Sequence, residues 1–168
     1  MSTSITTTLP TRATYRVATD RSECRFRARG MFGIPARGTM PIRTGTVHIQ
    51  DGRAHVTAEL DPAGFDSGIA RRDEHVRSPQ LLDVAAYPAI RFEGVLSADR
   101  TRVDGKLTVQ DRTEPVTLAV SEVHPHPTHV DVVATTRVDR HECGITALKA
   151  IIARHVDIEL TVTLVIGE

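Results

Sequence analysis

The feature that most constrains this chain is an alternation of apolar and polar residues with a period of two. It is clearest at residues 156–166, where Val156, Ile158, Leu160 and Val162 are separated by acidic residues and threonines. Successive side chains of a β-strand point to opposite faces. The run therefore predicts a strand of roughly eleven residues with one dry face and one wet face.

The same alternation recurs through most of the chain, with turn-forming residues between the runs. Asp51-Gly52 is a strong hairpin signal, because this dipeptide adopts positive φ at little cost. Together the runs predict about eight or nine strands between Tyr15 and Ile166. The other alternating runs are residues 24–29, 47–49, 56–60, 90–92, 103–109, 116–120 and 130–138.

Residues 68–84 break the pattern with dense charge and apolar residues at mixed spacing. They predict a short helix from Ala70 to His75 or Val76, whose start Ser67 could cap. A second helical turn is expected at residues 78–82, and another at residues 147–153, before the last strand.

These strands predict an all-β fold. Many antiparallel strands, each apolar on one face, can bury those faces only in a sandwich or a closed barrel. Strands near ten residues long favour an antiparallel, lipocalin-like barrel of about eight strands with one or two short helices. A barrel of this size is either filled by side chains or holds one small ligand.

The expected inner face is apolar and made of small side chains. The chain has no Trp, and aromatic residues make up only 4% of it. An elongated apolar void would bind a hydrophobic molecule, but composition alone does not decide between a hollow and a filled barrel. The predicted ligand-binding positions are Phe26, Ala28, Val56, Ala58, Ile90, Phe92, Leu107, Val109, Leu118, Val132, Ala134, Ile158 and Leu160.

Composition and charge exclude several classes of protein. Lys and Arg total 21, as do Asp and Glu, so the formal net charge is zero. A nucleic-acid-binding protein normally has a basic excess, and an anionic membrane surface attracts basic segments. No apolar run approaches the roughly 18 residues of a membrane span. We therefore expect no nucleic-acid partner and no integral membrane segment.

The chain is expected to form one domain, residues 14–168, behind a disordered leader of residues 1–13. The leader lacks the basic start and apolar core of a secretory signal, which favours a cytoplasmic location. Cys24 and Cys143 form neither a zinc-binding spacing nor a disulfide framework.

Four ordered motifs resemble the YceI-like family, over about residues 14–166. Asp66-Ser67-Gly68 with residues 72–78 resembles its "SIDT…RDxHLRS" signature, and residues 83–92 resemble "FDVxxYPxIxF". Residues 105–118 resemble "GxLTxxGxTxPVxL", and residues 140–145 with the closing strand complete the match. The chain is therefore similar to a family of lipocalin-like barrels.

This resemblance implies a long apolar pocket and non-catalytic binding, transport or storage of a polyisoprenoid or related amphiphile. An isoprenoid quinone, a polyprenyl phosphate or a fatty amide would fit, with no other cofactor, and homodimers occur in the family. The chain departs from the family pattern at Leu81-Leu82, Asp111 and Cys143. Smaller groups in place of aromatics at Leu81-Leu82 and Cys143 are expected to widen or reshape the pocket.

The charged segment at residues 71–77 has two interpretations. Arg72, His75 and Arg77 could form a polar rim that binds a phosphate or a quinone oxygen. Alternatively, the segment is a charge network that fixes the helix to the barrel, with Asp73 paired to Arg72 or Arg77. We favour the second interpretation for Asp73 and His75.

Residues suited to metal binding or catalysis give weaker signals. His124, His126 and His129 lie between strands with no sign of supporting partners, so a solvated hairpin is expected rather than a metal site. Motifs such as GxSxG, HExxH and the P-loop are absent from the sequence. A Ser67–His75 pair would be unusual, and Cys24 is expected to be a buried inert thiol.

Two alternatives to a lipid-binding barrel remain open. An isomerase or hydrolase acting on an apolar substrate would need an ionisable residue pointing into the pocket. A filled barrel that binds a partner through its outer surface would have no internal void.

Overall fold

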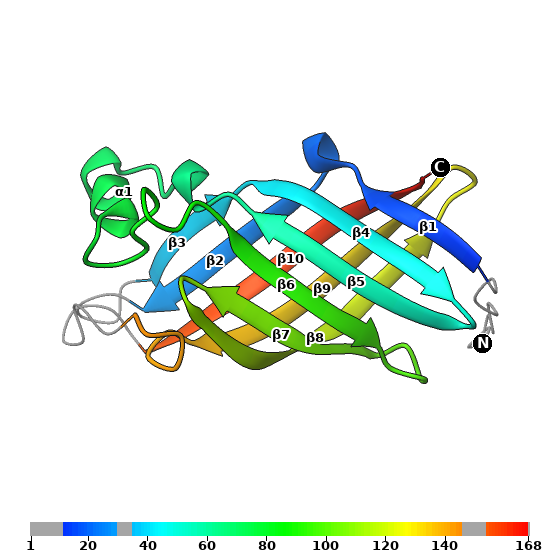
Figure 1. Cartoon of the computed structure of the whole chain (residues 1–168). Helices are drawn as coiled ribbons and strands as arrows, with labels where there is room; N and C mark the ends of the chain where they lie inside the picture. The colour runs from blue at the N-terminus through cyan, green and yellow to red at the C-terminus, as the bar shows by residue number, and fades with distance from the viewer. Residues whose placement is uncertain (1–11, 30–34, 146–153, 168) are drawn as a thin grey trace.

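The computed structural model describes residues 12–29, 35–145 and 154–167. Ten strands and one α-helix run along the chain in this part of the protein, with α1 at one end (Figure 1). The elements are β1 (Arg12–Val17), β2 (Glu23–Arg29), β3 (Pro35–Met40), β4 (Ile42–Gln50), β5 (Arg53–Leu60), α1 (Ala70–Arg77), β6 (Ile90–Leu96), β7 (Arg102–Val109), β8 (Arg112–Pro125), β9 (His129–Asp139) and β10 (His155–Ile166).

The strands form one antiparallel sheet that closes into a barrel. Its order is β1-β4-β5-β6-β7-β8-β9-β10-β2-β3, and an additional pairing joins β1 to β10. Two of the eight barrel strands each consist of two consecutive segments: β1 and β2 form one, and β3 and β4 form the other. β1 and β2 both pair with β10, at its end and its middle respectively, while β3 pairs with β2 and β4 with β1. The result is the predicted all-β, closed antiparallel barrel of eight strands.

Each interruption has a local cause. Between β1 and β2 the chain makes a 3-10 turn, Thr19–Arg21, and the Ser22 hydroxyl accepts a hydrogen bond from the Thr163 N–H of β10 (3.0 Å). Between β3 and β4 lies Pro41, which has no N–H to donate to a neighbouring strand.

The helical predictions are confirmed only in part. α1 confirms the helix expected from Ala70, but Ser67 is not its cap. Ile69 is the N-cap, without a side-chain hydrogen bond. Residues 78–82 form hydrogen-bonded turns rather than a helix, in which the Leu82 N–H donates to the Val76 carbonyl (2.9 Å).

Two other expectations fall wholly or partly outside the described residues. The helical turn predicted at 147–153 lies outside them, as do residues 1–11 of the expected leader. The last two leader positions, Arg12 and Ala13, belong to β1. Within the described part of the chain, no helix combines the length and the apolar character needed to cross a bilayer.

The strand pairings place the apolar positions on the inner face of the barrel. Ala58 lies opposite Phe92, which in turn lies opposite Leu107. Around the other side, Ala134 lies opposite Leu160. The alternation in the sequence therefore corresponds to an alternation between the lumen and the outer surface.

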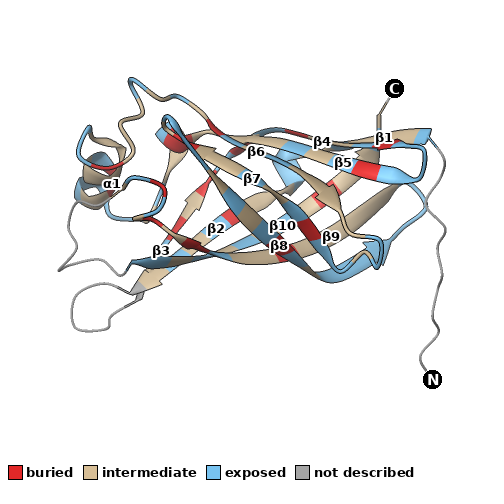
Figure 2. Cartoon of the chain, turned by 60° about the horizontal axis from the view of Figure 1, so that its bottom comes forward, coloured by how far each residue is buried: buried red, intermediate tan, exposed pale blue. Residues whose placement is uncertain are grey.

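One end of the barrel is packed with side chains. A cluster built on Met40, Ile90, Val109, Val138 and Cys143 also contacts Phe65 and Leu82, which lie in the segments flanking α1. Buried positions are few and separated along the strands, and much of the ribbon has intermediate burial (Figure 2).

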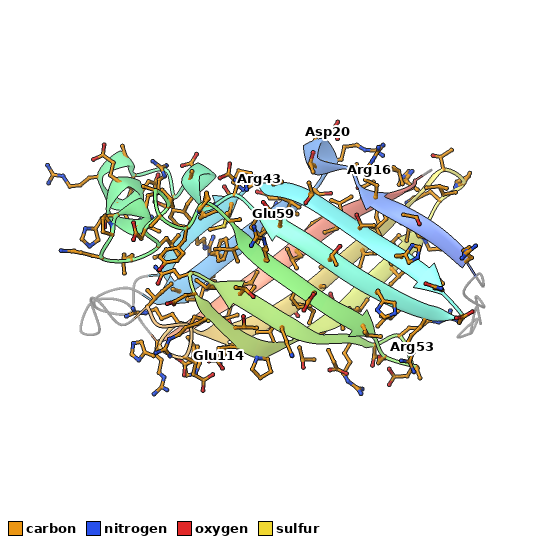
Figure 3. The ribbon with its side chains drawn as sticks, in the orientation of Figure 1. Arg16, Asp20, Arg43, Arg53, Glu59 and Glu114 are labelled. Carbon is orange, nitrogen blue, oxygen red and sulfur yellow. The ribbon has the colours of Figure 1, made fainter. Side chains whose placement is uncertain are left out.

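An ion-pair network on the outer surface joins neighbouring segments near this end (Figure 3). Arg43 lies 2.6 Å from the Glu59 carboxylate and 3.1 Å from that of Asp61, and it donates to the Pro88 carbonyl (3.0 Å). The hydrogen bond with Glu59 is the main reason why the pKa of Arg43 is raised. The network ties the start of β4 to the end of β5 and to the loop before β6.

Two glycines on the inner face allow a close approach of β6 and β7. Gly94 lies directly opposite Gly105. A methyl group added at Gly105 would lie 2.7 Å from the Phe92 ring and even closer to the Glu93 carbonyl oxygen. We therefore expect Gly105→Ala to lower the free energy of unfolding by about 1–3 kcal/mol in urea denaturation.

Gly167→Ala is the matched control, because its added methyl group would have no neighbour nearer than 3.5 Å. Equal stability of the two variants would contradict the close packing of Gly94 and Gly105.

Candidate functional site

The pairing register places every predicted ligand-binding position on the lumen side. Phe26 of β2 pairs with Ile158 of β10, and Val132 of β9 pairs with Val123 of β8. The alternation of side chains along each strand places the remaining predicted positions on the same inner face. Their contact with a ligand remains a prediction.

The lumen is not completely filled by these side chains. Ile90, Val109, Leu118 and Ala134 are buried, at 6–8% exposure. The other predicted positions have intermediate exposure although they face inward. A close-packed core leaves such side chains nearly inaccessible. The barrel therefore retains internal space beside an apolar wall.

A cavity of about 1090 Å³ lies against β2, β3, β8, β9 and β10. Its lining includes the inward-facing Phe26, Val116 and Ile158 together with outward-facing residues of the same strands. The cavity therefore contacts both faces of the barrel wall. Most of the lining residues face outward and the cavity is open to solvent, so it is a surface groove that reaches the inner wall, not the enclosed lumen itself.

The wall is open at this cavity because β8 and β9 separate. Their ladder ends at Ala119–Thr135, although β8 extends back to Arg112 and β9 on to Asp139. Pro115 has no N–H to donate, and the Thr117 carbonyl accepts the Thr136 hydroxyl (2.8 Å) instead of a ladder hydrogen bond. The gap was not predicted from the sequence, in which Pro115 is the available signal.

Charged side chains surround the outer part of the cavity. Arg137 pairs with Asp157 (2.8 Å), and this hydrogen bond is the main reason why the pKa of Asp157 is lowered. Arg27 and Arg37 are also in the lining, directly opposite each other across β2 and β3. Arg27 also lies opposite Asp157 across β2 and β10, and its charge contributes to the lowered pKa of Asp157, so an added anionic group here would share these arginines with that carboxylate.

The predicted polar rim near α1 is engaged in internal contacts. Asp73 is 4% exposed and accepts hydrogen bonds from the Ser67 N–H and hydroxyl. Arg72 donates to the Ser67 hydroxyl (2.9 Å), and Arg77 donates to the Phe65 carbonyl (2.6 Å). The expected pairing of Asp73 with Arg72 or Arg77 is therefore wrong, because the nearer donor is Ser67.

This arrangement gives the segment a structural role. The hydrogen bonds join residues 65–67 to α1, and His75 Nε2 is buried without a hydrogen-bond partner in the described residues. Headgroup binding by Arg72, His75 and Arg77 remains a prediction.

The three histidines predicted to lie in a hairpin do not form a single group. His124 lies nearest Glu122, at 3.9 Å. His126 and His129 stack with ring centroids 4.3 Å apart, and both approach Asp131. Sequence analysis missed the carboxylate because it lies beyond the run of histidines.

The candidate nucleophiles lack an activated geometry. Burial is the main cause that raises the pKa of Cys24 to about 12 and that of Cys143 to about 11, so both are neutral thiols near pH 7. The Ser67 hydroxyl donates to Asp73 rather than to His75.

Comparison with known proteins gives a consistent match. The sequence model of the YceI-like domain matches residues 15–164. A UPF0312 protein of Vibrio cholerae is 27% identical over 116 residues, covering 64% of this chain and 60% of that protein. A UPF0312 protein of Azotobacter vinelandii is 40% identical over 68 residues, 38% of this chain and 35% of that protein. These alignments span less than two thirds of either relative.

Two solved structures share the fold. BcnA of Burkholderia cenocepacia superposes with a TM-score of 0.69 at 19% identity, covering 88% of this chain and 98% of that one. A polyisoprenoid binding domain from Saccharophagus degradans, implicated in plant cell wall breakdown, gives 0.70 at 13% identity, covering 91% and 98%.

The contacts of Asp73 predict a specific loss of stability. Asp73→Ala leaves two Ser67 donors without their acceptor, so the free energy of unfolding should fall by about 1.5–3 kcal/mol. Glu74→Ala, at an exposed position of the same helix, is the control and should change little. Chemical denaturation measures both, and an unchanged Asp73→Ala variant would exclude the structural role.

Proposed function

Because this chain belongs to the YceI-like domain family, we propose that it binds a polyisoprenoid or a related long-chain amphiphile in its barrel, without converting it chemically. The observation that carries this proposal is an apolar inner wall that remains partly accessible in a closed barrel. The solved polyisoprenoid binding domain with the same fold supports it.

The character of the inner wall favours carriage or storage over catalysis. Along β5, β6, β9 and β10, the inward positions are apolar apart from Thr136, whose hydroxyl is already bonded to the Thr117 carbonyl. Acid–base chemistry requires an ionisable group within reach of the substrate. On β8, Glu114 has the inward register of Val116 and lies opposite Leu107, so one carboxylate borders the lumen at the end where Cys143 packs.

The gap between β8 and β9 supplies a route for the ligand. Phe26, Val116 and Ile158 would contact the tail, while Arg27 and Arg37 lie on the outer side of the same cavity. We place a phosphate or another polar headgroup beside these two arginines. This position differs from the rim at Arg72 and Arg77, where the guanidinium groups already have internal partners.

Affinity is expected to rise with tail length. Each buried methylene contributes about 0.8 kcal/mol and an isoprene unit has five carbons, so each added unit should tighten binding by up to about a thousandfold until the lumen is full. Ala58→Phe should weaken binding of the long ligands most, because Ala58 faces the lumen opposite Phe92. Because the chain contains no tryptophan, its own fluorescence interferes little with the assay. In this assay, quinones of graded length displace a fluorescent prenyl probe.

Thr57→Phe is the matched control, since Thr57 is the exposed, outward-facing neighbour of Ala58. The Thr57→Phe variant should bind each ligand with the same affinity as the unchanged protein. Failure of every quinone, polyprenol and fatty amide to displace the probe, together with no amphiphile in native mass spectra of the purified protein, would reject the proposed function.

The two headgroup positions can be separated by double variants. Arg27→Gln/Arg37→Gln should weaken binding of a polyprenyl phosphate by about tenfold, corresponding to one charge-assisted hydrogen bond, and leave the uncharged polyprenol nearly unaffected. Arg72→Gln/Arg77→Gln should lower the melting temperature and affect both ligands equally. A phosphate-selective loss in the second variant alone would place the headgroup at the α1 rim instead.

A further inference from the structure

A cluster of two imidazoles and a carboxylate lies at the end of the barrel away from α1. His126 belongs to the turn between β8 and β9, and His129 and Asp131 belong to the start of β9 (Figure 1). One potential ligand atom from each residue lies within 4.8 Å of the others. The prenyl-binding proposal does not use any of these residues.

The two imidazoles converge on the same carboxylate oxygen. His126 Nε2 lies 3.2 Å from Asp131 Oδ2, and His129 Nε2 lies 3.5 Å from it. Zinc binds nitrogen and oxygen ligands at about 2.0–2.1 Å with tetrahedral geometry, which places adjacent ligand atoms about 3.3 Å apart. These two separations are close to the edge length of a zinc tetrahedron, whereas the His126 and His129 rings are stacked 4.3 Å apart, so one ring must turn for both nitrogens to point at a shared ion.

The hairpin and the neighbouring strand hold the ligand residues in place. The His126 N–H donates to the His129 carbonyl (2.8 Å), which fixes the two ends of the turn. The Thr128 hydroxyl contacts His129 Nδ1 (3.3 Å), on the side of the ring away from the carboxylate. His126 is exposed, so its ring can rotate to direct Nε2 at a shared ion without disturbing the core.

Asp131 has the supporting partner that the sequence did not reveal. The Thr163 hydroxyl of β10 donates to Asp131 Oδ1 (2.7 Å), leaving Oδ2 free to face the imidazoles. Thr163 is 7% exposed, and its hydrogen bond is the main cause that lowers the pKa of Asp131. Partners of this kind orient metal-binding carboxylates and are typical of metal sites.

We propose that His126, His129 and Asp131 bind one divalent transition-metal ion, with zinc as the best match. The donor set is two neutral imidazole nitrogens and one carboxylate oxygen, a combination that suits zinc and its first-row neighbours rather than Ca²⁺ or Mg²⁺. Three protein ligands leave a fourth position for water. The ion would tie the turn at residue 126 to β9 and, through Thr163, to β10.

The proposal is tested on protein without a polyhistidine tag, after treatment with a chelating resin. Isothermal titration should show one Zn²⁺ per chain, and Co²⁺ should produce the visible absorption bands of a low-symmetry site. His126→Gln and His129→Gln should each weaken Zn²⁺ binding by about tenfold or more. Zn²⁺ should also raise the melting temperature of the unchanged protein, because it binds only the folded site.

His124→Gln is the control within the same hairpin: His124 lies directly opposite Asp131 in the β8–β9 ladder, but its Nε2 lies beside Glu122 (3.9 Å). It should retain both the affinity and the cobalt spectrum. No binding by the unchanged protein, or equal affinity in all three variants, would show that the cluster is only a hydrogen-bonded surface contact between imidazoles and Asp131. Because His126 is exposed, His126→Gln should fold normally. Its affinity for Zn²⁺ therefore tests the proposal even if His129→Gln folds poorly.

Discussion

The structure depends on one constraint, which is that apolar side chains must stay on the inner face all the way around a closed ladder of hydrogen bonds. A shift of one residue in any pairing would turn a whole strand's apolar set outward. The closure is completed by β1 and β2, which share β10 between them. The interruption between them allows the chain to change direction while both segments keep their apolar residues inside.

The same constraint explains why the lumen is narrow at one place and open at another. Gly94 and Gly105 lie directly opposite each other on β6 and β7, and a side chain at either position would come within 3 Å of atoms of the neighbouring strand. Elsewhere the wall carries Val, Ala, Leu and Ile together with Phe26 and Phe92, and a barrel of eight strands is just wide enough for such side chains to fill it or to leave room for one small ligand. The space left inside therefore depends on which side chains face one another across the lumen.

The sequence predicted what depends on local periodicity and missed what depends on contacts between distant segments. Strand positions, their inward faces and the helix at Ala70 follow from spacing alone. The hydrogen-bond partner of Asp73 could not be predicted from spacing, because Ser67 lies six residues away in a loop whose conformation no sequence pattern specifies. The His126–His129–Asp131 cluster was missed for a similar reason, since Thr163 reaches it only after β9 and β10 pair.

The positions where this chain departs from the family pattern bear on how a ligand would lie. Leu82 and Cys143 both pack in the cluster at the α1 end, and Cys143 is 3% exposed. The smaller side chains are thus accommodated within a packed region, and that end of the lumen is closed. A second cluster, of Val103, Leu118 and Ala134 with Leu160 packed against it, occupies the lumen on the other side, so the inward side chains that border the side opening are chiefly Phe26, Val116 and Ile158.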